Sequence, residues 1–354
     1  QSKFVHTISA GYVTGAIFVL AISSWYLLKG RDRGFALRSF RIAAAFGLAS
    51  ALSVIVLGDE SGYTAAESQE AKMAAMEAMW TTEPAPAGLT VFGIPDETRR
   101  VTHAEFKIPY VLGLIGTRTT DKTIPGIDEI ERKTAARIER GIVAVKTLEA
   151  LRKDPKNPAL LARLKEHQAD MGHGLLLKKY IADVAQATPE MKAQAVDDAI
   201  PRVAPLFWSF RIMVACAFLM LALMAVAFWS SARNRIESRP WLLKWALWSL
   251  PLPWIAAESG WIVAEYGRQP WTVQGVLPTH LSTSVLSTGD VVFSLAGFLI
   301  FYTLLFIVEM YLMFKYARLG PASLGTGRYH GELAHTSTGG SGAAAYAAFC
   351  GSRR

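Results

Sequence analysis

Long apolar runs alternate with polar stretches along the chain, and five of these runs are long enough to cross a bilayer as helices. A membrane-spanning helix needs roughly 20 predominantly apolar residues. The pattern therefore predicts an all-α integral membrane protein with five transmembrane helices. The predicted spans are about Phe4–Leu28, Phe40–Leu57, Leu206–Ser230, Trp241–Tyr266 and Val291–Phe314.

Basic residues between the apolar runs predict how the helices are oriented. They gather after the first span, between the third and fourth spans, and after the fifth span. These three places share one side if all five runs cross, and the positive-inside rule makes that side cytoplasmic. The residues are Lys29, Arg31, Arg33, Arg38 and Arg41, then Arg233, Arg235, Arg239 and Lys244, and finally Lys315 and Arg318.

The same pattern divides the chain into four parts. These are a transmembrane helix pair (4–57), a large extracytoplasmic loop domain (58–205), three further spans (206–319) and a disordered cytoplasmic tail (320–354). Within the loop domain we expect an amphipathic helix over Ile127–Arg152 and a helix rich in Ala, Met and Glu over Glu67–Trp80. A polar stretch of this length with its own helices is expected to be a folded unit.

The composition agrees with membrane spans and argues against other classes. The chain is 51% hydrophobic and 19% charged, whereas soluble domains carry about 25% charged residues. The net charge of +8 comes from loops beside the spans, so no nucleic-acid binding is expected. Cys216 and Cys350 lie far apart, which predicts neither a disulfide framework nor a zinc site. Because the chain begins with Gln1 and no leader precedes the first run, we expect it to be part of a longer protein.

Polar or ligating residues inside the predicted spans are candidates for function, because placing them in lipid is costly. His6 lies at the outer end of the first span, and Met213 lies roughly 11 Å into the third at 1.5 Å per residue. Each has an ordinary explanation, as an interfacial histidine and a packed methionine. Together they match an axial pair for a low-spin haem, which the topology permits. Arg211 either extends outward to the interface or supplies a cation for a haem propionate.

The fourth predicted span carries two acidic residues. Glu258 lies four residues after Trp254, so the two share a helix face. A carboxylate at this depth must be protonated, paired or bound to metal, which makes Glu258 a candidate haem-iron ligand or proton relay. Glu265 is expected to be a solvated residue at the membrane boundary. Glu309, in the fifth span, is expected to pack toward a partner subunit.

Six motifs resemble a single protein family in their order and spacing. Residues 267–279 read GRQPWTVQGVLPT, which is similar to the signature of the large subunit of cytochrome bd-type quinol oxidases. The resemblance covers nearly the whole chain, which looks like the C-terminal portion of that subunit. The other motifs are KFVHTISAGYVTGA (Lys3–Ala16), SVIVLGDESGY (Ser53–Tyr63), FRIMV (Phe210–Val214), PLPWIAAESGW (Pro251–Trp261) and FKYARLGP (Phe314–Pro321).

The resemblance implies three haem cofactors. His6 and Met213 match the axial ligands of the low-spin haem b558, and Arg211 matches an arginine associated with that haem. Glu258 matches the ligand of the high-spin haem b595. Trp254 matches the tryptophan that lies between this haem and haem d.

The resemblance also implies a quinol site in the loop domain, whose length matches the long-loop branch of the family. Lys72 and Glu77 match positions linked to quinol oxidation, although their local sequence alone predicts solvated charges. They are five residues apart, so on a regular helix they would point roughly 140° from each other. Arg268 and Gln269 of the signature match cofactor-binding positions.

The implied activity is that of a terminal respiratory oxidase in the bacterial cytoplasmic (inner) membrane, with the long loop in the periplasm. Ubiquinol or menaquinol would be oxidised at the outer face, and electrons would pass through the b haems to haem d, where O2 becomes water. Outward proton release and inward uptake would build a gradient without pumping. The implied partners are a second large membrane subunit (subunit II), small single-span subunits and lipid. The family's subunit has about nine spans, and the haem d ligand belongs to the N-terminal ones.

Two other functions are open on the residues themselves. A haem b quinone-binding subunit without oxygen chemistry would share the pair His6 and Met213 but would not need Glu258. A transporter would line a path with Glu258 and Arg211, although the chain contains nothing that resembles inverted repeats or paired broken helices.

Overall fold

The computed structural model describes residues 2–320, and contacts within the chain divide it into two compact units. The first unit comprises the described residues up to Lys29 together with Leu37–Val285. The second comprises Gly30–Ala36 together with the described residues from Leu286 onward. Apart from Gly320, the predicted tail at 320–354 lies outside the described residues.

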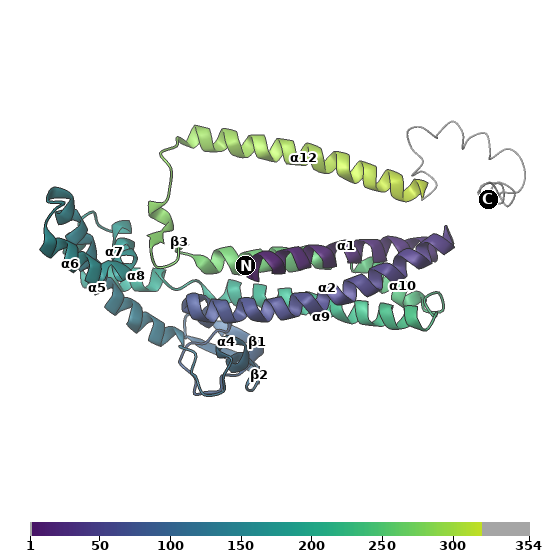
Figure 1. The fold of residues 1–354 in the computed structure, drawn as a ribbon, viewed down its shortest axis with the longest axis horizontal. Helices are drawn as coiled ribbons and strands as arrows, with labels where there is room; N and C mark the ends of the chain where they lie inside the picture. Colours follow the sequence, from purple (N-terminus) through teal and green to yellow (C-terminus); the bar gives the residue numbers. More distant parts are fainter. Residues whose placement is uncertain (1, 321–354) are drawn as a thin grey trace, which may run out of the picture. The chain divides into compact units, whose positions relative to one another are not determined.

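Four helical segments in the described part of the chain are long and apolar enough to span a bilayer (Figure 1). They confirm four of the five predicted spans, and the second runs beyond the predicted end at Leu57 because the residues that follow contain helix-forming Ala and Glu and no proline. The segments contain α1 (Ser2–Leu28), α2 (Arg33–Ser68), α9 (Val203–Ala232) and α12 (Thr288–Leu319).

The fourth predicted span, Trp241–Tyr266, is not one helix. It forms α10 (Pro240–Trp248) and α11 (Leu252–Glu265), with a short break between them. Pro251 and Pro253 explain the break, because proline lacks the amide hydrogen that a helix interior needs and its ring clashes with the preceding turn. Proline is tolerated where a new helix begins. The five-helix prediction is therefore corrected to four continuous helices and one broken segment.

An apolar core joins the membrane helices of the first unit. Leu20 of α1, Phe40 of α2, Leu223 of α9 and Leu242 of α10 are fully buried in one cluster. Gly47 of α2 faces α9 within this core, and a Cβ there would overlap the end of a methionine side chain. The same Cβ would lie 2.9 Å from the Cβ of Ala16 in α1, which cannot turn aside as the methionine end can, so the approach of α2 to α1 favours a small residue at this point.

The loop domain after α2 is mostly helical. The predicted helix at Ile127–Arg152 is confirmed as α5, whereas the one expected over Glu67–Trp80 is confined to the short α3, because α2 itself runs on to Ser68. The helices are α3 (Glu70–Met76), α4 (Val111–Thr117), α5 (Ile127–Lys153), α6 (Pro158–His167), α7 (Met171–Leu176) and α8 (Pro189–Asp198), with 3-10 turns η1 (Gln168–Asp170), η2 (Leu177–Lys179) and η3 (Val184–Gln186).

Two small antiparallel sheets correct the all-α expectation. β1 (Leu89–Asp96) pairs with β2 (Val101–Ile108) in the loop domain. β3 (Trp271–Val273) pairs with β4 (Leu277–Pro278) in the GRQPW loop, between the 3-10 turns η4 (266–268) and η5 (279–281). β1 and β2 are rich in the β-branched and aromatic residues that favour strands.

Glycines allow α7 to lie directly against α5. A Cβ at Gly141 of α5 would lie 2.3 Å from the amide nitrogen of Gly174 and 2.5 Å from the carbonyl oxygen of Asp170. Arg137 and Arg140 of α5 bind the two carboxylate oxygens of Asp170 at 2.7 and 2.6 Å. The backbones of α5 and α7 are therefore in contact, and the ion pairs of Asp170, which directly precedes α7, stabilise this contact.

Gly141→Ala is expected to destabilise the loop domain. Overpacking against backbone costs about 1–3 kcal/mol, which outweighs the gain of at most about 1 kcal/mol from removing a helical glycine. Thermal unfolding followed by circular dichroism should show a lower midpoint than in the parent protein. Gly15→Ala is the matched control, since a Cβ there meets nothing within 4 Å. Equal midpoints for the two variants would contradict the helix contact.

Candidate functional site

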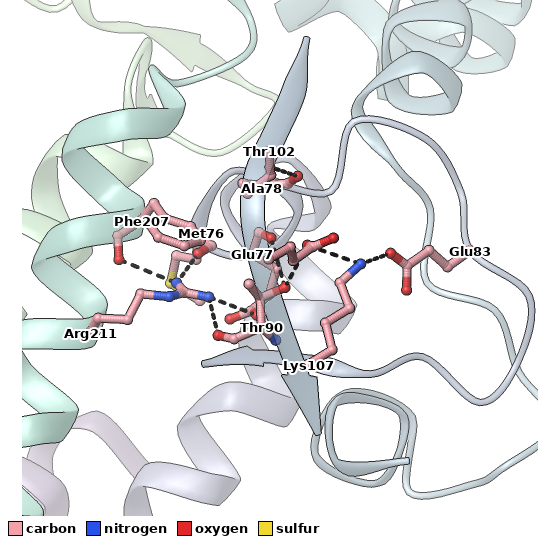
Figure 2. A network of polar contacts seen from close by, with 10 residues as sticks. Met76, Glu77, Ala78, Glu83, Thr90, Thr102, Lys107, Phe207 and Arg211 are labelled. Carbon is pink, nitrogen blue, oxygen red and sulfur yellow. Dashed lines mark hydrogen bonds and ion pairs between the residues drawn. The ribbon is translucent and has the colours of Figure 1, made fainter. Parts of the chain in front are cut away.

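The end of α3 brings Glu77 against α9. The helix closes with a Schellman-type turn, in which the amides of the two residues after Glu77 donate back into the last turn at 3.2 and 2.9 Å. Ala78 adopts a left-handed φ of +49°, which is uncommon for a residue with a Cβ. This turn leaves the Met76 carbonyl and the Glu77 side chain beside Arg211 of α9 (Figure 2).

The Glu77 carboxyl is held on one side only. The residue is 2% exposed, and its Oε2 accepts hydrogen bonds from the Arg211 guanidinium at 3.0 Å and from the Thr90 amide at 3.1 Å. Burial raises the pKa of Glu77, and the positive charge of Arg211 opposes that rise. Oε1 is buried and has no hydrogen-bond partner among residues 2–320. One carboxyl oxygen is therefore available to a further donor.

Arg211 joins α9 to the loop domain. Its guanidinium donates to the carbonyl oxygens of Thr90 at 2.5 Å and Met76, in addition to Glu77, and it lies 3.6 Å from the ring centre of Phe207. The side chain is only 11% exposed. Of the two alternatives for Arg211, extension outward to a solvated interface does not agree with this burial, because the loop domain supplies the acceptors. A contact with a haem propionate stays a prediction.

A second charged group extends this network across the strands. The Thr90 hydroxyl donates to Glu105 at 3.2 Å, and Lys107 pairs with Glu105 at 3.1 Å and with Glu83. Figure 2 shows Lys107 and Glu83 on the side of Thr90 away from Arg211. These hydrogen bonds raise the pKa of Lys107 against the effect of its burial. The charges near Glu77 are thus held in pairs.

Lys72 points from α3 toward α11 instead. It is 6% exposed, and its Nζ donates to the carbonyl oxygen of Ala264 at 3.0 Å. Its aliphatic chain crosses Gly267 of the GRQPW loop, where a Cβ would lie 2.9 Å from Lys72 Cε. Burial, together with nearby Lys3 and Arg268, lowers the pKa of Lys72 to about 8. The expectation of a solvated charge is wrong for Lys72.

Glu77 also departs from the solvated charge that its local sequence predicts. Lys72 and Glu77 are both buried, and they contact different membrane helices, α11 and α9. This agrees with the divergence expected from their spacing on a helix. Because Lys72 lies in α3 and Glu77 caps its end, one short helix directs both side chains.

The GRQPW loop is anchored in the loop domain by its tryptophan. Trp271 is 3% exposed and packs with its ring centre 5.0 Å from that of His173 in α7. Burial lowers the pKa of His173 to about 4, and no local sequence signal marks this residue. Arg268 pairs with Glu265, and Gln269 Oε1 accepts a hydrogen bond from Thr279 at 3.0 Å. The signature residues therefore fix the loop that borders Lys72.

His6 and Met213 carry donor atoms suited to haem iron. His6 is half-buried against Gly58 of α2, with 3.5 Å between its Cε1 and a Cβ placed there, and its Nδ1 has no hydrogen-bond partner among the described residues. The sulfur of Met213 lies 3.0 Å from the Cβ position of Gly260 in α11. An imidazole whose Nδ1 has no partner in the described part of the chain and a thioether fit low-spin haem ligation. That the two ligate one iron stays a prediction.

Trp254 and Glu258 lie on an open face of α11. Trp254 is 66% exposed, Trp261 on the same face is 65% exposed, and Glu258 is exposed with them. The expectation that Glu258 is buried is therefore not met within the first unit, whose described residues leave that face of α11 open. A carboxylate here is accessible to a ligand, and its role as a haem-iron ligand stays a prediction.

The fold and the site define a class: a helical membrane protein whose loop domain is attached to its spans through buried charged residues. A family model described as cytochrome bd terminal oxidase subunit I matches residues 1–321. The chain belongs to this family.

Relatives and a solved structure agree with this assignment. Cytochrome bd-II ubiquinol oxidase subunit 1 of Escherichia coli (strain K12) is 46% identical over 92% of this chain and 63% of its own length. Cytochrome bd ubiquinol oxidase subunit 1 of Bacillus subtilis (strain 168) is 28% identical over 90% of this chain and 56% of its own length. The bd oxidase structure from Geobacillus thermodenitrificans shares the fold with a TM-score of 0.62 at 22% identity, over 90% of this chain and 58% of that one. The chain thus spans about three fifths of these proteins.

Lys72→Met is expected to stabilise the protein near pH 7 by up to about 3 kcal/mol, the equivalent of lowering a pKa from 10.5 to about 8. Between pH 8 and pH 10.5, Lys72 is protonated in the unfolded protein but not in the folded protein, so the stability of the parent protein rises with pH. The stability advantage of Lys72→Met therefore disappears over this range. Thermal midpoints from pH 7 to 10.5 measure this. Lys153→Met, at an exposed position, is the control. If the difference in thermal midpoint between Lys72→Met and the parent protein stays constant from pH 7 to 10.5, the lowered pKa of Lys72 is contradicted.

Proposed function

We propose that this chain carries the quinol-oxidising site and two haem sites of a terminal respiratory oxidase that reduces O2 to water. The supporting observation is the position of α3. Through Glu77 it contacts Arg211, which lies two residues before Met213 in α9. Through Lys72 it contacts α11, the helix that carries Glu258. The candidate quinol residues therefore connect the two helices with candidate haem ligands.

Lys72 and Glu77 have complementary properties for quinol oxidation, which releases two electrons and two protons. Glu77 has a raised pKa and a free Oε1, so it would accept a proton from a quinol hydroxyl. The Lys72 amine, with its pKa near 8, would donate a hydrogen bond that positions the head group. Arg268 and Gln269 would keep the GRQPW loop in place beside it. Protons would leave to the outer side.

His6 and Met213 would hold haem b558, and Glu258 would hold haem b595 next to Trp254. Arg211 would add a positive charge near the first haem while it binds Glu77. The bound haems would supply one-electron transfer and, at haem d, oxygen reduction. The haem d ligand would come from segments outside this chain.

The chain would lie in a bacterial cytoplasmic membrane with its loop domain in the periplasm and its C-terminus in the cytoplasm. It would assemble with a second large membrane subunit and small single-span subunits. Quinol oxidation outside and proton uptake inside would generate a proton gradient without pumping. The exposed face of α11 would pack against further parts of the complex.

Met213→Leu is expected to remove the low-spin b band from the reduced-minus-oxidised spectrum of the complex and to leave the other haem bands, because leucine has no donor atom for iron. Met220→Leu in the same helix is the control, since Met220 is buried in the apolar core. A spectrum of Met213→Leu that retains the low-spin band would exclude the ligand assignment. Absence of any chlorin band in the parent complex would favour an electron-transfer subunit over an oxidase.

Gly267→Ala is expected to raise the KM for quinol roughly tenfold, the equivalent of about 1.4 kcal/mol, with a smaller change in kcat. The new Cβ would lie 2.9 Å from Lys72 Cε and 3.1 Å from Leu206 Cδ2, so Lys72 must shift. Steady-state oxygen uptake with varied quinol measures this. Gly289→Ala, whose Cβ would meet nothing closer than 3.6 Å, should leave KM unchanged. If Gly267→Ala leaves the KM for quinol unchanged, the proposal that Lys72 positions quinol is contradicted.

A further inference from the structure

The β1–β2 hairpin runs alongside the first turns of α9. At one end, the Thr90 carbonyl accepts a hydrogen bond from Arg211 at 2.5 Å. Farther along, Phe92 meets Trp208 with 5.8 Å between ring centres. At the other end, Glu97 Oε1 accepts a hydrogen bond from the Ala204 amide at 2.8 Å. The hairpin therefore follows α9 from residue 204 to residue 211.

These contacts show which part of α9 lies beside each end of the hairpin. Seven residues separate Ala204 from Arg211, which corresponds to roughly 10 Å along the helix axis. α9 is one of the helices apolar enough to cross a bilayer. The Thr90 end of the hairpin thus lies beside the apolar part of α9, and the turn at Glu97 lies near the end of the helix.

The exposed side chains of the hairpin change character along this direction. The end near Arg211 exposes Phe92 (47%), Phe106 (62%), Ile108 (42%) and Tyr110 (56%), which follows β2. The turn end carries charged residues, among them Arg99 and Arg100. Exposed Ile94 lies between the two ends, opposite His103, whereas exposed Val101 lies at the turn end, opposite Asp96. The hairpin is therefore apolar where it lies deep and charged where it lies near the end of α9.

The charged side chains at the end of the hairpin near Arg211 are paired, so they are compatible with an apolar environment. Lys107 is paired with Glu105 at 3.1 Å and with Glu83, and each of the three side chains is at most 30% exposed. A paired charge costs far less to remove from water than an isolated one. The surface that remains open at this end is mainly aromatic and aliphatic.

We propose that the β1–β2 hairpin inserts its apolar end into the outer leaflet of the bilayer, at the boundary between phospholipid headgroups and acyl chains. The occupant of this surface is lipid because the surface continues an exposed side of α9, a helix apolar enough to cross a bilayer, and that side carries Trp208, an aromatic residue of the type found at membrane interfaces. The graded polarity matches the gradient across that interface, where amphipathic elements bury an apolar face about 5–10 Å deep. The inference does not depend on the proposed quinol chemistry.

The test is site-specific photocrosslinking of the intact complex in phosphatidylcholine–phosphatidylglycerol vesicles. Phe106→p-benzoylphenylalanine places the probe on the apolar end of the hairpin with little change in shape, and Ile108→p-benzoylphenylalanine is a second position in case the first variant folds poorly. Leu161→p-benzoylphenylalanine is the control, because Leu161 of α6 is 47% exposed and no described contact joins it to a membrane helix. Mass spectrometry identifies the adducts.

The proposal predicts phospholipid adducts at position 106 in several-fold excess over position 161. Adducts at position 106 to a protein segment would overturn it, because another chain or another part of the complex would then cover the hairpin. Absence of any adduct at positions 106 and 108, in variants with the parent haem spectrum, would also overturn it, because the hairpin would then lie in water.

Discussion

The buried pair of Glu77 and Arg211 is the interaction on which the rest of the site depends. Removing one partner from such a pair costs about 3–5 kcal/mol, because the other charge is left unpaired away from water. The pair forms only if α3, β1 and α9 meet, since Thr90 binds both side chains. It therefore fixes the loop domain to the membrane helix that carries Met213.

A second attachment lies on the opposite side of α3. The Lys72 side chain packs against Gly267 and binds the backbone of α11. Trp271 of the same GRQPW loop packs against α7. The loop domain is thus held by polar contacts to α9 and by packing to the GRQPW loop. Between these attachments, two buried groups with shifted pKa values contact the two helices that carry Met213 and Glu258, and such groups are often found at functional sites.

Hydropathy predicted five spans, four of which are continuous helices, and periodicity predicted the long helix α5, because length and periodicity are local properties of the sequence. Hydropathy missed the break before Leu252, because the two prolines lie inside an apolar run. Periodicity missed β1 and β2, because register shifts at Phe92 interrupt their pairing. The Glu77–Arg211 contact joins residues 134 positions apart, so no local pattern could reveal it. Lys72 and Glu77 were found through family resemblance alone.

A double-mutant cycle on Glu77 and Arg211 tests this account most directly. Thermal stability of the complex would be measured for Glu77→Gln, Arg211→Gln and the double variant, with the low-spin haem spectrum recorded for each. The account predicts that the double variant loses clearly less than the sum of the single losses, with a coupling energy toward the upper end of the 0.5–3 kcal/mol range measured for contacting residues, about 2 kcal/mol or more. Additive losses would contradict the claim that this pair attaches the loop domain to α9.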